Sequence, residues 1–150
     1  MAAFGGCPFL ATVVIADDSG LISVGDAAFN KCSALVALAL PDSVTSLGDA
    51  VLEDCTSLRS VLIPKLITRI PADSFKGATA LTSVTLPDGL RTIGKQAFEG
   101  CSALDAITIP AGVTKIAASA FRGCTALKKK PRVSKKKKKA KKRARRGAPL

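Results

Sequence analysis

Histidine, tyrosine and tryptophan are absent from the 150-residue chain, and six phenylalanines are its only aromatic residues. Without histidine, neither a Ser-His nor a Cys-His catalytic pair can form. The acid pairs Asp17–Asp18 and Glu53–Asp54 are adjacent in sequence, so their side chains diverge and do not suit paired acid–base catalysis. No P-loop or GxGxxG pattern is present. We therefore predict a protein that is not an enzyme, with no cofactor and no metal site.

The sequence also lacks an apolar run close to the ~20 residues of a membrane-spanning helix. Residues 9–16 faintly resemble the apolar part of a signal peptide, but no basic residue precedes them and two acids follow directly. The five cysteines are an odd number, which argues against a simple disulfide framework in the absence of a clear secretory signal. We expect neither a membrane span nor a set of paired disulfides.

Positive charge is concentrated at one end of the sequence. The formal net charge is +12, yet residues 128–146 contain 14 of the 23 Lys and Arg residues and no acid. The remaining residues have nine bases and eleven acids, so they are nearly neutral. A like-charged block of this density repels itself and stays disordered. We predict a folded domain over residues 1–127 and a disordered Lys/Arg-rich tail over residues 128–150.

A 23-residue period organises the predicted domain. Proline, phenylalanine and cysteine recur at this spacing, and so do three rows of aliphatic residues. The proline row is Pro41, Pro64, Pro87 and Pro110; the phenylalanine row is Phe29, Leu52, Phe75, Phe98 and Phe121; the cysteine row is Cys32, Cys55, Ala78, Cys101 and Cys124. The coincidence of six rows indicates a repeat protein.

One unit reads L-x-x-V-x-I-P-x-x-V-x-x-I-G-x-x-A-F-x-G-C, and its opening is the strand signature of leucine-rich repeats. Period-2 alternation places Val84 inward and Thr85 outward. The proline then ends the strand, because it cannot donate to a ladder. A turn should follow, and the G-x-x-A-F-x-G-C stretch should form a short helical or 3₁₀ turn. The first coil keeps the phase from Phe4 to Ile15, and a two-residue insertion near residues 16–20 accounts for its offset.

Together these residues resemble the BspA-like leucine-rich repeats, also called the Treponema pallidum type, over roughly residues 4–127. The motif is carried almost intact by Ile109, Pro110, Val113, Thr114, Ile116, Ala120, Phe121 and Cys124. The resemblance implies an α/β repeat solenoid of about five coils, with short parallel strands on a concave face and short helical or 3₁₀ turns on a convex face. It also implies protein–protein contact, and relatives are often surface proteins of bacteria and protists that take part in adhesion.

Two rows could be mistaken for functional sites. The cysteine row suggests metal ligation, but Ala78 interrupts it, which indicates a position for a small core side chain. The phenylalanine row suggests an aromatic platform, but Leu52 interrupts it, which indicates a packing spine. After Leu127 the inward strand positions fall on Lys130 and Arg132, so we expect the solenoid to end there.

The concave strand face is the default binding surface of such a solenoid. It should be small, flat and nearly uncharged, with Ala37 and Ala39 at one side. Our candidate protein-binding residues are Arg59, Ser60, Leu62, Thr82, Ser83, Thr85, Asp105, Ala106 and Thr108. This face lacks the Tyr, Trp and Arg anchors typical of hot spots, so an alternative is that the repeats are a scaffold and the tail or the ends bind.

Three functions compete for the tail. Dense Lys/Arg runs act as nuclear localisation signals, which predicts an import receptor as partner and a nuclear or nucleolar location. The same charge binds nucleic-acid phosphates non-specifically. It also binds anionic lipids, although no aromatic anchor favours the membrane. Cytoplasmic and cell-surface locations remain the alternatives. The basic tail residues are Lys128, Lys129, Lys130, Arg132, Lys135, Lys136, Lys137, Lys138, Lys139, Lys141, Lys142, Arg143, Arg145 and Arg146.

Overall fold

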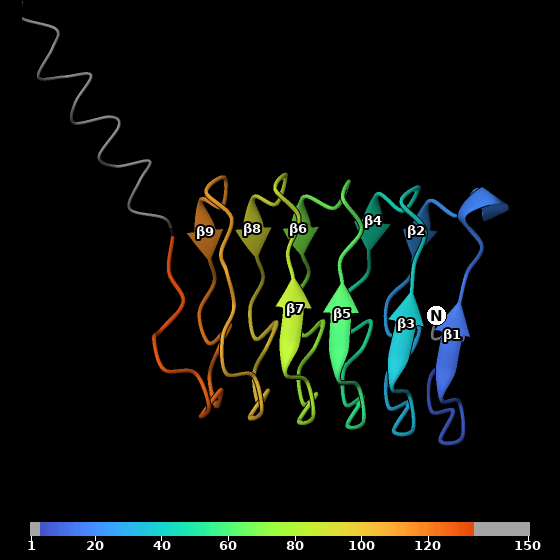
Figure 1. Cartoon of the computed structure of the whole chain (residues 1–150), viewed down its shortest axis with the longest axis horizontal. Helices are drawn as coiled ribbons and strands as arrows, with labels where there is room; N and C mark the ends of the chain where they lie inside the picture. The colour runs from blue at the N-terminus through green and yellow to red at the C-terminus, as the bar shows by residue number, and fades with distance from the viewer. Residues whose placement is uncertain (1–3, 134–150) are drawn as a thin grey trace, which may run out of the picture.

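The computed structural model describes residues 4–133, which wind into a solenoid of short parallel strands joined by turns (Figure 1). The strands lie in two rows. The front row consists of β1 (Thr12–Val14), β3 (Ala37–Ala39), β5 (Ser60–Leu62) and β7 (Ser83–Thr85). The back row consists of β2 (Ser23–Val24), β4 (Ser46–Leu47), β6 (Arg69–Ile70), β8 (Thr92–Ile93) and β9 (Lys115–Ile116). The predicted leucine-rich-repeat solenoid is confirmed.

The front strands have the register that the repeat predicts. The strands β3, β5 and β7 bury the central residue and expose the two on either side, so Val84 is buried while Ser83 and Thr85 face outward. In β1 the central residue Val13 is half-buried. Aliphatic residues, cysteines and phenylalanines from successive coils fill the space between the two rows. Their burial is the main source of stability, at roughly 25 cal/mol for each Å² of apolar surface removed from water.

The back row was not foreseen, because we expected only a turn after each proline. In this row Arg69 partners Thr92, and Thr92 partners Lys115. Each back strand is only two residues long, which is too short for an alternating pattern of apolar and polar residues to reveal it.

The predicted insertion in the first coil is visible in the strand registers. Thr12 lies opposite Ala37, 25 positions later, whereas Ser23 lies opposite Ser46, at the normal spacing of 23. The two extra residues therefore lie between β1 and β2. The 3₁₀ helix η1 (Asp17–Ser19) occupies this connection and ends at Gly20, whose φ of 74° is left-handed.

The G-x-x-A-F-x-G-C stretches form turns, where short helical or 3₁₀ turns were expected. In the first regular unit the N–H groups of Ala28, Asn30 and Cys32 each donate to the carbonyl three residues earlier, as in a 3₁₀ helix. However, Ala27 and Lys31 have φ values of 54° and 60°. A left-handed residue at each end stops the turn from propagating into a helix.

The last predicted front strand is also missing from the described residues. Ala106 and Thr108 face outward and Ile107 is half-buried, but this segment forms no ladder with β7. The segment that follows it in space, residues 128–133, carries Lys130 at the inward position and Pro131, which has no N–H to donate. The expected strand therefore lacks a partner on its outer side.

Strand pairing is interrupted once in each row. In the front row β1 pairs with β3 and β5 with β7, while in the back row β2 pairs with β4 and β6 joins β8 and β9. Neither β3 with β5 nor β4 with β6 forms a ladder, although β3 and β5 are in contact. Both interruptions lie between the same two coils, and we call this place the seam.

Candidate functional surfaces

The front face, defined by the outward side chains of β1, β3, β5 and β7, is open to solvent and has no charged side chain on its strands. The predicted residues Ser60, Leu62, Ser83 and Thr85 are exposed there side by side, because Ser60 partners Ser83 and Leu62 partners Thr85. Leu62 is 70% exposed, which is unusual for a leucine. The face is therefore a flat surface of small side chains around one large apolar residue.

Sequence reasoning missed the apolar end of this face. Val14 on β1 is 74% exposed and lies opposite Ala39 on β3. Val36 is 40% exposed and begins the flanking row that continues with Arg59, Thr82 and Asp105, all exposed. The period-2 alternation that marks Val13 as inward could have identified Val14, but its position in an irregular first coil hid it.

The cysteine row has a polar role besides packing. The Sγ atoms of Cys55, Cys101 and Cys124 donate to the phenylalanine carbonyl of the preceding coil at 3.0–3.2 Å, and Cys32 does the same to Phe4. All five cysteines are free thiols. Burial raises the pKa of the Cys55 thiol to about 12, so it stays protonated and unreactive. Within residues 4–133 no group of three His, Cys, Asp or Glu could hold a metal ion.

The phenylalanine row is a stack inside the solenoid. Ring centroids are 5.3 Å apart for Phe4 and Phe29, 5.1 Å for Phe75 and Phe98, and 5.2 Å for Phe98 and Phe121, with the rings nearly parallel. Leu52 separates the first pair from the other three rings. The middle rings are fully buried, whereas Phe4 at one end is 48% exposed. The row therefore packs the core and ends in an open ring.

Hydrogen bonds between successive turns all point the same way, and we call this row of turns the spine. In each junction after the first, three N–H groups donate to carbonyls of the next coil, as Phe75 does to Ala97 at 2.7 Å and Gly77 to Glu99 at 2.8 Å. The first junction has two such bonds among the described residues, from Phe4 and Gly6. The donors are alternate residues, the first and last of which are left-handed, as in Asp73 and Gly77. This alternation turns successive N–H groups to one side.

At the C-terminal end the spine donors find no acceptor among the described residues. The equivalent N–H groups belong to Ser119, Phe121 and Gly123, and within residues 4–133 they meet no acceptor. A cleft of about 830 Å³ opens beside them, lined by the last turn and by residues 130–133. Lys130 and Arg132 are exposed at its rim, so the inward positions of this segment stay unburied, as predicted from their charge.

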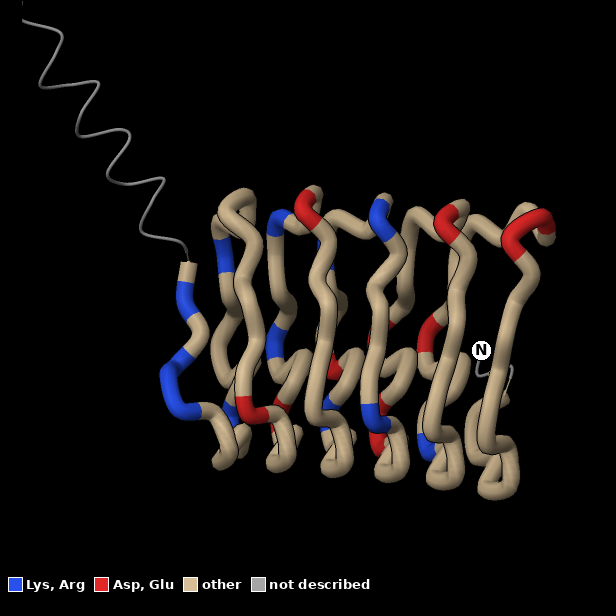
Figure 2. The backbone as a smooth tube through the Cα atoms, viewed as in Figure 1, with Lys and Arg blue, Asp and Glu red and all other residues tan. Residues whose placement is uncertain are grey.

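Charge is sorted along the solenoid axis. Residues 4–63 contain seven acids and two bases, whereas residues 64–133 contain four acids and eleven bases. Basic residues gather at the end that carries residues 128–133 (Figure 2). The two halves thus have net charges of −5 and +7. Composition over the predicted domain, which ends at residue 127, concealed this gradient, because residues 64–127 carry seven bases and four acids, and their net charge of +3 offsets most of the −5.

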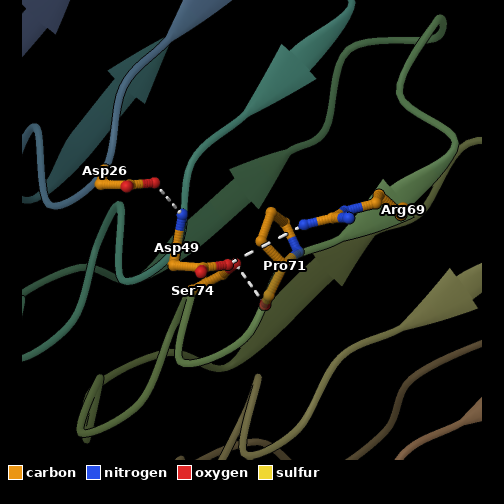
Figure 3. Close-up of polar contacts among 5 residues, drawn as sticks. All are labelled: Asp26, Asp49, Arg69, Pro71 and Ser74. Atoms are coloured by element: carbon orange, nitrogen blue, oxygen red, sulfur yellow. Dashed lines mark hydrogen bonds and ion pairs between the residues drawn. The ribbon is translucent and has the colours of Figure 1, made fainter.

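Two exposed ion pairs span the seam. Lys65 lies 3.8 Å from Asp42, and Arg69 lies 3.9 Å from Asp49. Asp49 is also tied to the preceding coil, since its N–H donates to Asp26 at 2.8 Å (Figure 3). Exposed pairs of this kind contribute up to about 1 kcal/mol each and weaken in salt.

Only the first residues of the predicted tail lie within the described part of the chain. Lys128, Lys129, Lys130 and Arg132 are exposed and form no ion pair there. The predicted disorder and the remaining basic residues, from Lys135 to Arg146, fall outside the described residues. No helix of the described residues is long and apolar enough to cross a membrane.

Comparison with known proteins bears on the repeat directly. A family model described as the BspA type leucine rich repeat region matches six copies over residues 1–128. The chain belongs to the BspA-type leucine-rich repeat family. This is a family of repeat proteins that are generally non-enzymatic. A search of curated proteins found no match.

Solved structures of this family are similar to the chain over most of its length. A leucine rich cell surface protein from Faecalibacterium prausnitzii is 37% identical, with a TM-score of 0.74, over 77% of this chain and 30% of that one. A leucine-rich repeat protein from Bacteroides ovatus is 32% identical, with a TM-score of 0.71, over 78% and 32%. The T. pallidum leucine rich repeat protein is 31% identical, with a TM-score of 0.73, over 77% and 56%. The chain thus spans between 30% and 56% of the length of these three proteins.

Proposed function

We propose that this chain is a non-enzymatic protein-recognition module that acts at a cell surface and binds its partner through the front face. The exposure of Leu62 at the middle of an uncharged strand face carries this proposal. A leucine held 70% in solvent contributes nothing to the core, whereas covering it with a partner removes apolar surface from water. The cell-surface location is supported by the relative from F. prausnitzii, whose description places it there.

The front face is suited to a flat partner. Alanine, serine and threonine at the outward positions allow close approach, and they carry no charge whose desolvation opposes binding. Val14, Ala39 and Leu62 form an apolar side, whereas Ser83 and Thr85 supply hydroxyl groups. We expect the partner to present an apolar centre with hydrogen-bonding groups around it, as protein interfaces commonly do.

A paired substitution tests which face binds. Leu62→Asp should weaken capture of a surface partner by about tenfold or more, because it puts a charge at the centre of an apolar contact. Thr68→Asp is the matched control, since Thr68 is an exposed residue beside the back row. Both proteins would be compared in pull-downs from surface-biotinylated cells. Equal capture by the two variants would exclude the front face as the binding surface.

Location is tested separately. Antibody labelling and protease shaving of intact cells should reach the full-length protein if it acts at the surface. If a fluorescent fusion instead enriches in a nucleus, and a fusion with the tail arginines and lysines from Lys135 onward changed to glutamine does not, the nuclear interpretation of the tail replaces the cell-surface one.

The tail supports a second candidate function, the binding of nucleic-acid phosphates. Its 14 basic residues without an acid are the observation that favours it. Neutralising ten of them, from Lys135 to Arg146, should remove most of the affinity for RNA and most of its salt dependence, because each phosphate contact releases a counterion. An affinity that neither salt nor this neutralisation changes would eliminate the candidate.

A further inference from the structure

The two ends of the solenoid are complementary, and we propose that the C-terminal end of one chain docks on the N-terminal end of a second copy. The docking would repeat the geometry of a junction between two internal coils. It goes beyond the proposed function, because it uses the ends and leaves the front face free. Four independent features of the ends support it.

The first feature is the pair of unused hydrogen-bonding groups. At the C-terminal end, the N–H of Gly123 occupies the position from which Gly100 donates to Arg122 at 2.7 Å. At the N-terminal end, Gly5 occupies the position of Arg122, and its carbonyl accepts no hydrogen bond within the described residues. Stacking a second copy in register brings the donor of Gly123 to the carbonyl of Gly5 in the partner copy.

The second feature is the aromatic stack. Phe121 is the last ring at one end and Phe4, at 48% exposure, is the first ring at the other. The internal rings stack with centroids 5.1–5.3 Å apart. In the same register, Phe4 of the second copy covers Phe121 of the first, and both lose their exposed faces to an aromatic contact worth about 0.5–1.5 kcal/mol beyond the area that it buries.

The third feature is the thiol of Cys7, for which residues 4–133 provide no acceptor. Cys32 and the three buried cysteines after it each donate to the phenylalanine carbonyl of the coil before. Cys7 has the same place in the first coil and is half-buried, and no coil precedes it among residues 4–133. Docking provides one, because the carbonyl of Phe121 in the first copy takes the position that Phe4 has for Cys32.

The fourth feature is charge. Asp17 and Asp18 follow β1 in the first coil, and Arg132 in the last coil lies at the register position of Ile15, two residues before Asp17. Register stacking therefore brings these acids near Arg132, at the end of the described chain. The net charges of the two halves are also complementary, since residues 4–63 carry −5 and residues 64–133 carry +7. Complementary charges fix the orientation of such a contact and speed its formation.

The docking joins two different surfaces, so each copy keeps one free end and the assembly does not close by itself. We therefore expect open chains whose length grows with protein concentration. The front faces would align along such a chain and present several copies of one weak binding surface, which raises the avidity for a multivalent partner.

Sedimentation velocity of the full chain over a concentration series tests the proposal. We expect the sedimentation coefficient to rise with concentration in low salt, and to fall back at 1 M salt, where the screening length is about 3 Å. Asp17→Lys with Asp18→Lys should raise the apparent dissociation constant about tenfold or more, because it places like charges together. Asp88→Lys with Asp105→Lys is the control: it makes the same change in net charge at exposed positions away from the N-terminal end.

A second readout follows the thiol of Cys7. Its alkylation by iodoacetamide should slow as concentration rises in the wild-type chain and in the control variant, but not in the Asp17→Lys, Asp18→Lys variant. Far-UV circular dichroism checks that each variant is folded. A chain that stays monomeric overturns the proposal. So does an assembly that both variants weaken equally, since this would mean that the tail attracts acids without regard to position.

Discussion

The stacked phenylalanines allow the contribution of an aromatic contact to be separated from that of burial. The Phe98 ring has another ring on each side, with centroids 5.1 and 5.2 Å from its own. Phe29 and Phe75 each have a ring on one side and Leu52 on the other. All three side chains are 2% exposed or less. Replacing each by leucine, which the repeat already accepts at position 52, therefore removes two aromatic contacts in one case and one in the other two.

The expected magnitudes follow from this count. The smaller side chain and the space it leaves should cost roughly 1–2 kcal/mol at each position, because the surroundings are equally buried. Each lost aromatic contact adds about 0.5–1.5 kcal/mol. Phe98→Leu should therefore lower the free energy of unfolding by about 0.5–1.5 kcal/mol more than Phe29→Leu or Phe75→Leu, and the last two should agree with each other.

Urea denaturation followed by far-UV circular dichroism measures these differences. Intrinsic fluorescence cannot serve, since the chain has no tryptophan or tyrosine. The slopes of the transitions must match the wild type, so that midpoints report stability and not a change in cooperativity. Equal losses in the three variants would refute the reasoning, because they would show that the stack contributes by burial alone.

Three further predictions concern the register, the thiols and one acid. Val84→Asp should unfold the solenoid, since it buries an unpaired charge, while Thr85→Asp should leave the thermal melting temperature nearly unchanged. If both variants lowered the melting temperature equally, the strand register described here would be wrong by one residue. At pH 8, mass spectrometry after iodoacetamide treatment should find Cys7 modified and Cys55 intact, because burial raises the pKa of Cys55 to about 12; a Cys55 that reacts as fast as Cys7 in the folded chain would contradict its burial. Burial, together with Asp54 and Asp73, raises the pKa of Glu53 above 4.5, so its charged form is less stable in the folded chain than in the unfolded one. The chain should lose stability as the pH rises from about 4.5 through this pKa, and Glu53→Gln should remove that loss in melts recorded from pH 4 to 7; the same pH dependence in both proteins would exclude Glu53 as its source.

The repeat rows predicted what depends on burial. The inward residues of the front strands, the cysteine and phenylalanine rows and the two-residue insertion are all side-chain spacings, and all lie where the period places them. The turns depend on backbone conformation instead. Ala27, Ala50 and Gln96 have a left-handed backbone conformation although none is a glycine, so their residue types do not predict that conformation.

The candidate surfaces were predictable to the same degree. The exposure of Leu62 and Thr85 follows from the alternation of the strand. The thiol bonds depend on contacts between coils, and so does the lack of an acceptor within residues 4–133 for the N–H groups of Ser119, Phe121 and Gly123. Such contacts depend on which way each peptide group turns, and a row of side chains does not report it. The charge gradient was present in the sequence but became meaningful only when the residues were ordered along an axis.

The seam gives the solenoid a mechanical joint. At this one place both strand rows are unpaired and the aromatic stack is broken by Leu52. Besides core packing, the two coils are held by spine bonds, by the Cys55 thiol bond, by hydrogen bonds from Ser57 and Arg59 to the preceding coil, and by the two ion pairs of Asp42 and Asp49. A force that pulls the two ends apart should therefore open the molecule there first, into two shorter blocks that each remain wound. Because the ion pairs weaken in salt, the strength of this joint is set in part by the surrounding medium, whereas the blocks on either side, held by paired strands and stacked rings, are much less sensitive to it.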